Sequence, residues 1–453
     1  ALIPLVTLLA EPAIEVSFTE NEEEIWAEEL GKQVMEKTFN VDEESKVVEQ
    51  KFSDSPLPEV EDPLAAPPEL EITDPLVGAS SDIKAPDVGA ALTGRQRGRK
   101  GDLLAGYGGN RLTEEAVIAA LEWLARQQRQ DGSWSLRGPY ANPGERENVV
   151  AATAMALLAF QGHGHTHLPP RDTSKKTVEN ERAVRYAKIV ANGWAALGKY
   201  LDKDGNFIQD DISHARLYTQ AQATIALCEL WAMSEDPKYK EMAQRAVDYA
   251  AKIQDAQGGW RYDPGSDSDT SVSGWFMMAL QSARMGKLNV PGETLKKLGA
   301  YLDSVALAGG AQYRYRKDGH TNPAMTAEGL LCRQYLGWPK ADQRLRDGCD
   351  YLATRPMVWA KRDVYHWYYA TQVMHHMEGV YWRDWNRVMC KMLPTNQVRK
   401  GKERGSWEPE GDTWGDVGGR LYVTCLSTYM LEVYYRHLPL YRKAPPQGST
   451  AIE

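Results

Sequence analysis

Apolar residues from Thr113 onward recur at the spacing of an amphipathic helix. Thr113 can cap this helix, and Glu114 and Glu115 place negative charge in its first turn, which stabilises a helix start. The apolar positions then share one face at about 3.6 residues per turn; they are Ala116, Ala119, Ala120, Trp123 and Leu124. The pattern predicts a helix that packs one side against the rest of the protein.

A short turn follows this helix and recurs along the chain. In Asp131-Gly132-Ser133-Trp134, the glycine permits the turn and the aromatic residue can fold back onto the helix end. The aromatic residues of these turns stand about 46 to 73 residues apart, which is the length of a two-helix repeat. Comparable turns reach Phe207, Trp260, Tyr313 and Trp407, with a degenerate copy at Trp359.

A second helix, apolar on nearly every side, is predicted after each turn. Such a helix is buried all round, as between an outer layer and the centre of a ring. Six outer and six inner helices can close a ring, and closure removes the exposed ends that an open solenoid must cap. We therefore predict an all-α fold, an (α/α)6 toroid, over residues 105–440. The expected inner helices are Val149–Phe160, Leu217–Trp231, Val272–Met285, Ala324–Leu336, Val364–Met377 and Leu421–Tyr435.

Several short sequence segments in these repeats resemble segments of known proteins. The turns resemble the repeats of squalene–hopene cyclases, oxidosqualene cyclases and protein prenyltransferase β subunits, over roughly residues 105–440. A closer resemblance is to uncharacterised bacterial proteins, familiar from planctomycetes, with prenyltransferase or squalene-oxidase repeats. The resemblance implies the terpenoid cyclase fold, whereas the planctomycete likeness implies no activity. The segments that resemble the planctomycete proteins are Gly259-Trp260-Arg261-Tyr262, Asp269–Trp275, Tyr368–Met374 and Leu431–Arg436.

Residues 1–104 differ in composition from the repeats. They are rich in Glu, Asp and Pro and end in a basic run, Arg95–Lys100. Because such a segment buries too little apolar surface to fold alone, we predict an extended acidic arm that holds a protein partner or a second copy of the chain. The apolar stretch Ala1–Ala10 suggests the end of a removed segment and hence the cell envelope or periplasm, with a cytoplasmic location left open. Residues 441–453 are expected to form a tail.

Composition excludes some classes of function. The net charge of −9 argues against a nucleic-acid partner, because phosphate binding needs a basic surface. The 14 Trp and 22 Tyr, against 6 Phe, suit aromatic-lined cavities and interfaces. The cysteines sit in apolar helical stretches without a Cys-x-x-Cys pair, so buried free thiols are expected; they are Cys228, Cys332, Cys349, Cys390 and Cys425.

The catalytic motifs of the related enzymes are incomplete. Class II cyclases protonate an alkene with the central acid of Asp-x-Asp-Asp, and the nearest match is Asp267-Ser268-Asp269-Thr270. In that match the proton donor's position holds Ser268, so Asp267 and Asp269 are candidate acids only, and Asp269 is equally a helix cap. The zinc set of prenyltransferases is reduced to Asp347-Gly348-Cys349 and His366, too close together in sequence. We expect no cofactor.

Two further groups of residues are candidates for binding. His163, His165 and His167 alternate in one loop and could meet a metal ion, although a surface loop without metal is the simpler interpretation. Aromatic residues of the inner helices could line a central cavity that binds a flat apolar lipid or stabilises a carbocation, or they could simply pack between helices. These cavity candidates are Trp275, Tyr365, His366, Tyr368, Tyr369, Tyr422 and Tyr429.

Two functional hypotheses follow. The first is a non-catalytic toroid that acts as a structural or docking subunit of a larger, envelope-associated assembly, because the catalytic motifs are incomplete and the arm is long. The second is an isoprenoid- or lipid-binding protein, or a terpene cyclase-like enzyme, that uses the central aromatic cavity. The fold does not choose between them, since function depends on the sites placed on a fold.

Overall fold

A computed structural model describes residues 92–171, 174, 176–207 and 215–441. The expected arm up to residue 91 and the tail from residue 442 lie outside the described residues. No helix among the described residues is long and apolar enough to cross a membrane.

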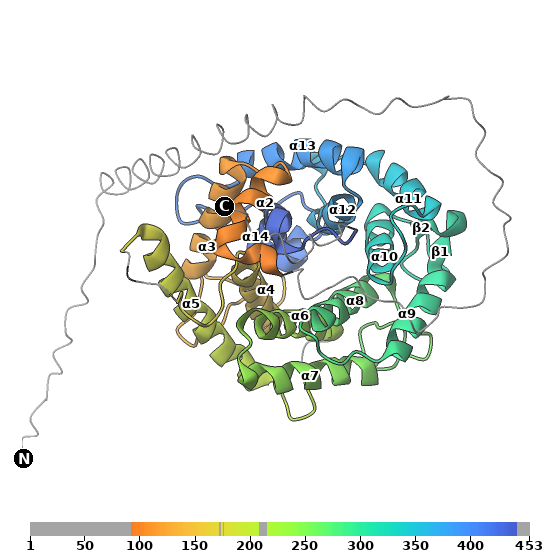
Figure 1. The fold of residues 1–453 in the computed structure, drawn as a ribbon, viewed down its shortest axis with the longest axis horizontal. Coiled ribbons are helices and arrows are strands. Elements are labelled where there is room, and N and C mark those ends of the chain that lie inside the picture. Colours follow the sequence, from red (N-terminus) through yellow and green to blue (C-terminus); the bar gives the residue numbers. More distant parts are fainter. Residues whose placement is uncertain (1–91, 172–173, 175, 208–214, 442–453) are drawn as a thin grey trace, which may run out of the picture. The chain divides into compact units, whose positions relative to one another are not determined.

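Two concentric layers of helices form the ring over the described residues (Figure 1). The outer helices are α3 (Arg111–Arg126), α5 (Val178–Leu197), α7 (Pro237–Lys252), α9 (Gly292–Val305), α11 (Gln343–Ala353) and α13 (Gly379–Thr395). The inner helices are α4 (Val149–Gly162), α6 (Arg216–Ser234), α8 (Thr270–Met285), α10 (Pro323–Tyr335), α12 (Val364–Met377) and α14 (Gly415–Arg436). The predicted all-α toroid of six hairpins is confirmed.

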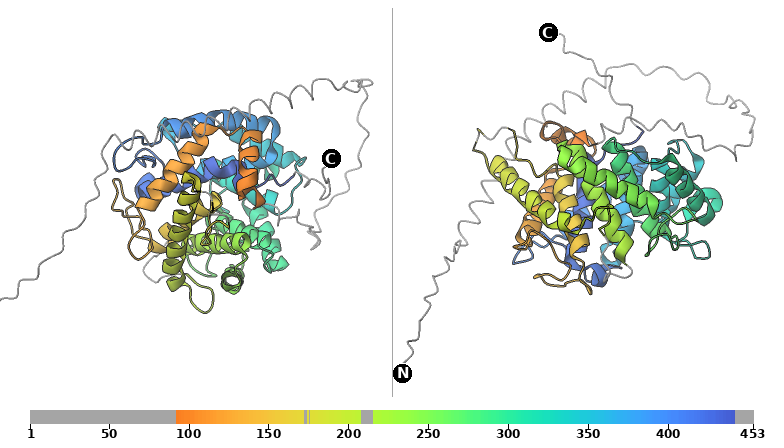
Figure 2. Two further views of the ribbon diagram at one scale, coloured as in Figure 1. Left: turned by 60° about the vertical axis from the view of Figure 1, so that its left-hand side comes forward. Right: turned by 90° about the horizontal axis from the view of Figure 1, so that it is seen from below.

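Short elements complete the described chain. Two strands, β1 (Ala306–Leu307) and β2 (Gln312–Tyr313), pair antiparallel beside α9. The view from below shows the two layers as well, because the outer helix α7 lies in front of the inner helices (Figure 2). The short 3-10 helices are η2 (Thr93–Arg95), η3 (Gly198–Tyr200), η5 (Ala308–Gly310) and η6 (Trp359–Lys361).

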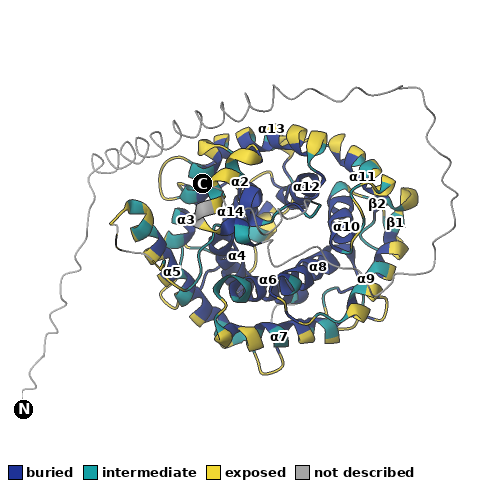
Figure 3. Ribbon diagram, in the orientation of Figure 1, coloured by how far each residue is buried: buried dark blue, intermediate teal, exposed yellow. Residues whose placement is uncertain are grey.

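Burial explains the two sequence patterns. Nearly all residues of the inner helices are buried, whereas the outer helices bury one face and expose the other (Figure 3). An inner helix contacts neighbours on every side, so it is apolar all round, and an outer helix needs only an apolar stripe. All five cysteines are buried free thiols, as the sequence predicts.

The recurring turn ties neighbouring hairpins together at three of the junctions. After α7, the Gln254 amide donates to the carbonyls of Gly258 (2.8 Å) and Thr294 (2.9 Å), and Thr294 belongs to the next outer helix. The Trp260 indole N–H donates back to the Ala250 carbonyl (2.9 Å). Gly258 has φ +100°, and a side chain there would meet the backbone of α9. The same contacts recur at Gln128 with Trp134 and at Gln397 with Trp407.

The ring closes through the same contacts. Helix α14 contacts α4, and α13 contacts α3. The Gln397 amide, at the end of the last outer helix, donates to the Ala116 carbonyl of the first outer helix (2.8 Å). The first and last hairpins are therefore joined by the same glutamine contact that links α3 to α5 and α7 to α9.

Residues 92–104 correct the predicted boundary of the arm. They form η2 and most of α2 (Arg97–Gly106), which contact α14, instead of continuing an extended arm. The reason is Arg95: its guanidinium is buried and pairs with Glu229 of α6, 134 residues away (2.8 Å). The sequence does not reveal this partner, because Glu229 is distant along the chain.

Candidate functional site

The inner helices all begin at the same end of the ring, here called the N-terminal mouth. Asn148, before α4, donates to Thr219 near the start of α6 (2.8 Å). Ser271, near the start of α8, is hydrogen-bonded to Tyr218 of α6 (2.7 Å) and to Tyr365 of α12 (2.6 Å). The inner helices run parallel, so their N-termini, which carry partial positive charge, lie together at this mouth. Carboxylates placed here are stabilised by several helix N-termini.

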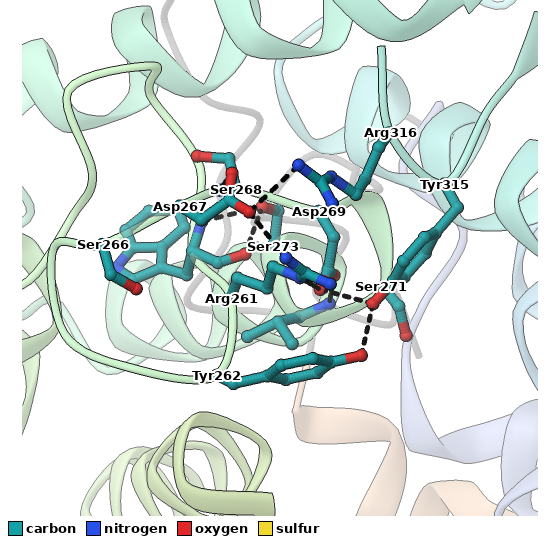
Figure 4. Close-up of polar contacts among 12 residues, drawn as sticks. Arg261, Tyr262, Ser266, Asp267, Ser268, Asp269, Ser271, Ser273, Tyr315 and Arg316 are labelled. Atoms are coloured by element: carbon teal, nitrogen blue, oxygen red, sulfur yellow. Dashed lines mark hydrogen bonds and ion pairs between the residues drawn. The ribbon is translucent and has the colours of Figure 1, made fainter. Parts of the chain in front are cut away.

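Asp269 caps an inner helix. Its carboxylate accepts from the Val272 N–H (2.7 Å) and from the Tyr315 hydroxyl (2.8 Å), and Arg261 lies 3.5 Å away (Figure 4). The side chain is fully buried, and this burial raises the pKa of Asp269 to about 6. Both hydrogen bonds of the Asp269 carboxylate are structural, because one caps α8 and the other holds the loop that carries Tyr315.

Asp267 and Ser268 belong to the same turn. Asp267 is partly exposed and pairs with Arg261 (2.6 Å) and Arg316 (3.2 Å) (Figure 4). Partial burial opposes ionisation, but the Ser268 N–H and Arg261 outweigh it and lower the pKa of Asp267. Ser268, at the position of the cyclase proton donor, donates to Asp255 (3.0 Å). The hydrogen bonds and ion pairs of the cyclase-like motif therefore stabilise this turn and the start of α8.

Glu328, which the sequence analysis did not single out, is a buried acid of a different kind. It lies in α10, is fully buried and accepts from the Tyr365 hydroxyl (3.2 and 3.3 Å). Burial, with the nearby Asp269 carboxylate, raises the pKa of Glu328 well above its usual range. The available signal was a lone acid in an apolar inner helix.

A chain of hydroxyl groups leads from the N-terminal mouth to Glu328. The partly exposed Tyr218 donates to Ser271, Ser271 is hydrogen-bonded to Tyr365, and Tyr365 donates to Glu328. These residues come from α6, α8, α12 and α10. Each hydroxyl can accept one proton and pass on another, so the arrangement can connect Glu328 with solvent.

Two more carboxyl groups of this mouth cap inner elements. Asp363 caps α12 by accepting from the His366 N–H (2.9 Å), and burial raises the pKa of Asp363. Asp412 accepts from the Val364 N–H (2.8 Å), and burial raises its pKa to about 6. Tyr422 lies near both: burial and then the Asp412 and Asp363 carboxylates raise the pKa of Tyr422 well above its usual range.

The other cavity candidates are divided between the lumen and the helix interfaces. Trp275 and Tyr368 line the central cavity and stack at 5.8 Å. Tyr369 packs edge-on against Trp275 (6.0 Å). The Tyr429 hydroxyl donates to a carbonyl of α4, and the His366 ring instead faces α13, so His366 is not in the lumen.

The central space of the ring among the described residues is small. The central space lined by Trp275, Met278, Tyr368 and Gln372 measures about 10 Å³, room for about one water molecule. Ligand pockets typically measure about 300–1,000 Å³. A larger hollow of about 410 Å³ lies at the surface beside Glu145, Glu410 and Asp416. Large side chains on neighbouring helices fill the lumen.

The histidine loop does not converge on one point. His163 Nδ1 lies 2.9 Å from His165 Nε2, and the other His163 nitrogen faces Glu114 (2.9 Å). His167 instead faces Asp236 (2.9 Å). No group of three or more His, Cys, Asp or Glu side chains suited to a metal ion is found among the described residues.

Fold and site together describe an α/α toroid with a buried acid at one mouth. No family model matches the chain, and a search of curated proteins finds no match. Solved structures similar to it include two variants of the type II terpene cyclase MstE from Scytonema. The complex with geranylgeranyl dihydroxybenzoate shares 12% identity at TM-score 0.45 and covers 72% of this chain and 97% of its own. The complex with merosterolic acid A shares 12% at TM-score 0.44, covering 72% and 96%.

An α-amylase from Clostridium perfringens is also similar, with 10% identity and TM-score 0.45 over 71% of this chain and 97% of its own. These similarities are too distant to transfer any activity. The assignment to a toroid rests on the helices and on ring closure themselves.

Proposed function

We propose that the protein binds an apolar, isoprenoid-class ligand in the ring and uses Glu328 as the acid that acts on it, in the manner of a terpene cyclase. The observation that supports this function is the setting of Glu328: a carboxyl group fully buried beside aromatic side chains, where burial raises its pKa well above the usual range. A glutamine or an apolar residue would cost less to bury there. Costly buried acids are typical of functional sites.

The chemistry needs no further reactant. The Glu328 O–H bond breaks as a C–H bond forms at the ligand's alkene, which leaves a carbocation and a carboxylate. The ring faces of Trp275, Tyr365 and Tyr369 can stabilise the cation. Loss of a proton from a neighbouring carbon, accepted by Glu328 directly or through Tyr365 and Ser271, restores the acid, so the net reaction is an isomerisation or cyclisation.

The filled lumen sets a condition on this proposal. Because only about 10 Å³ is free, the ligand must displace flexible side chains that line the lumen, chiefly Met278 and Gln372. Methionine adapts readily to such changes because it is unbranched and has three rotatable bonds.

The test uses geranylgeraniol as the probe, followed by native mass spectrometry for binding and gas chromatography with mass detection for products. We expect wild type to bind one molecule and convert it, and Glu328→Gln to bind without conversion. Met278→Ala should bind more tightly, since it enlarges the lumen. Met389→Ala is the matched control, because Met389 is equally buried but lies on α13, away from the lumen. Absence of binding to both wild type and Met278→Ala would refute the proposal.

A second candidate is the non-catalytic structural or docking subunit of a larger, envelope-associated assembly. The filled lumen favours it, as does the structural use of Asp267 and Asp269. Under this hypothesis no probe binds, and protein isolated gently from its source runs as an oligomer or stable complex in native mass spectrometry. A ligand-free monomer would refute it.

A further inference from the structure

The end of the ring where the inner helices finish, here called the C-terminal mouth, holds a buried guanidinium. Arg95 donates to the Glu229 carboxylate (2.8 Å), to the Arg436 carbonyl (3.0 Å) and to the Gln161 carbonyl (3.3 Å). The two carbonyls belong to the last turns of α14 and α4, and Glu229 belongs to α6. Helix C-termini carry partial negative charge, so two of them and one carboxylate make a site suited to a planar cation.

Glu229 depends on this guanidinium for its charge. Burial opposes ionisation, but Arg95 and Arg436 outweigh it and lower the pKa of Glu229. Arg436 lies 3.4 Å from Glu229 and 2.8 Å from Glu432, so it is shared between two acids. Removal of Arg95 would leave two buried carboxyl groups facing one cation.

The residues around Arg95 fit the mouth closely. Gly94 lies against the backbone of α14, where an added Cβ would stand 2.6 Å from the Tyr435 carbonyl oxygen. Leu92 is buried against Met285 of α8. We call residues 92–96 the cap. The small central cavity lies directly behind it, since Glu229 and Arg436 contact Arg95 and also line that cavity, together with Ser282.

We propose that the C-terminal mouth is a guanidinium-binding site, that the chain fills it with its own Arg95, and that the cap must leave before this end of the ring can open. The vacated site takes another guanidinium, such as an arginine side chain. The proposal does not depend on the function of Glu328.

The test follows access to the cavity with an introduced thiol. Ser282→Cys changes one atom of a buried, cavity-lining residue, and its maleimide labelling in the folded full chain is followed by peptide mass spectrometry. We expect adding Arg95→Ala to speed labelling at least about tenfold, as a local opening. Arg333→Ala is the matched control, because Arg333 is another buried arginine but pairs with Asp303 of an outer helix.

Chemical rescue tests the identity of the site. Ethylguanidinium added to the Arg95→Ala protein should restore slow labelling. Ethylammonium should not, because it has the same charge but lacks the planar set of N–H donors of a guanidinium. Arg95→Lys, which keeps the charge, should fold and label at an intermediate rate even if the alanine variant does not fold. Equal labelling of the Arg95 and Arg333 variants, or rescue by both cations alike, would overturn the proposal.

Discussion

Glu328→Gln should make the protein more stable at neutral pH, and increasingly so as the pH rises. The pKa of Glu328 is raised above the ordinary value of 4.5. At pH values between 4.5 and this raised pKa, the folded protein keeps the Glu328 proton, whereas the unfolded chain has lost it. The free energy of unfolding of the wild-type protein therefore falls as the pH rises. Glutamine cannot ionise and keeps an acceptor for the Tyr365 hydroxyl, so the variant lacks this loss.

The size of the effect follows from linkage. Each pH unit between the unfolded-state and folded-state pKa values of Glu328 costs the wild type about 1.4 kcal/mol. The stability difference between Glu328→Gln and wild type should therefore grow by about this amount per pH unit until the folded-state pKa is reached. The contribution from Asp412, which is present in both proteins, cancels in the difference.

Urea unfolding at several pH values, followed by tryptophan fluorescence and circular dichroism, measures this difference. Glu293→Gln on the exposed face of α9 is the control and should show no such pH dependence. If the difference between Glu328→Gln and wild type stays constant across the range, Glu328 is ionised in the fold and the acid proposed for the ring does not exist.

Three other predictions concern the architecture. Gly258→Ala should destabilise by about 1–3 kcal/mol because of its positive φ and the adjacent backbone of α9, whereas Gly299→Ala, which meets only open space in a helix, should stabilise by about 0.5–1 kcal/mol; thermal melts compare them. Gln397→Ala should cost about 2 kcal/mol by removing a link that closes the ring, measured by urea unfolding. Asp269→Ala should cost about 1–2 kcal/mol and Asp269→Asn less, because asparagine also caps helices; equal losses of melting temperature would contradict the capping role.

The repeat architecture could be predicted because its signals are local. The glycine and aromatic residue of each turn, such as Gly258 and Trp260, stand within a few residues of each other in sequence. An inner helix that is apolar on every side indicates by its own sequence that it is buried. The sequence also raised helix capping as the alternative for Asp269, and the contact with Val272 agrees with it.

The candidate site could not be predicted from the sequence, because its residues come from several repeats. Glu328 meets Tyr365 and Ser271 only after three hairpins are in place, and Arg95 meets Glu229 only when the chain returns to the mouth of the ring. The filled lumen could not be foreseen either, because aromatic residues such as Trp275 look the same in sequence whether they surround a space or fill it.

Closure through Gln397 and Ala116 gives the domain no intrinsic beginning. The junctions from α3 to α5 and from α7 to α9 use the same glutamine contact as the closing junction. The order of the hairpins along the chain can therefore be changed without changing their order around the ring. A circular permutant, cut in the loop between two hairpins and joined from α14 to α3 by a linker, should therefore fold to the same ring. Deletion or duplication of one hairpin should not, because five or seven hairpins cannot meet at the angle that six define.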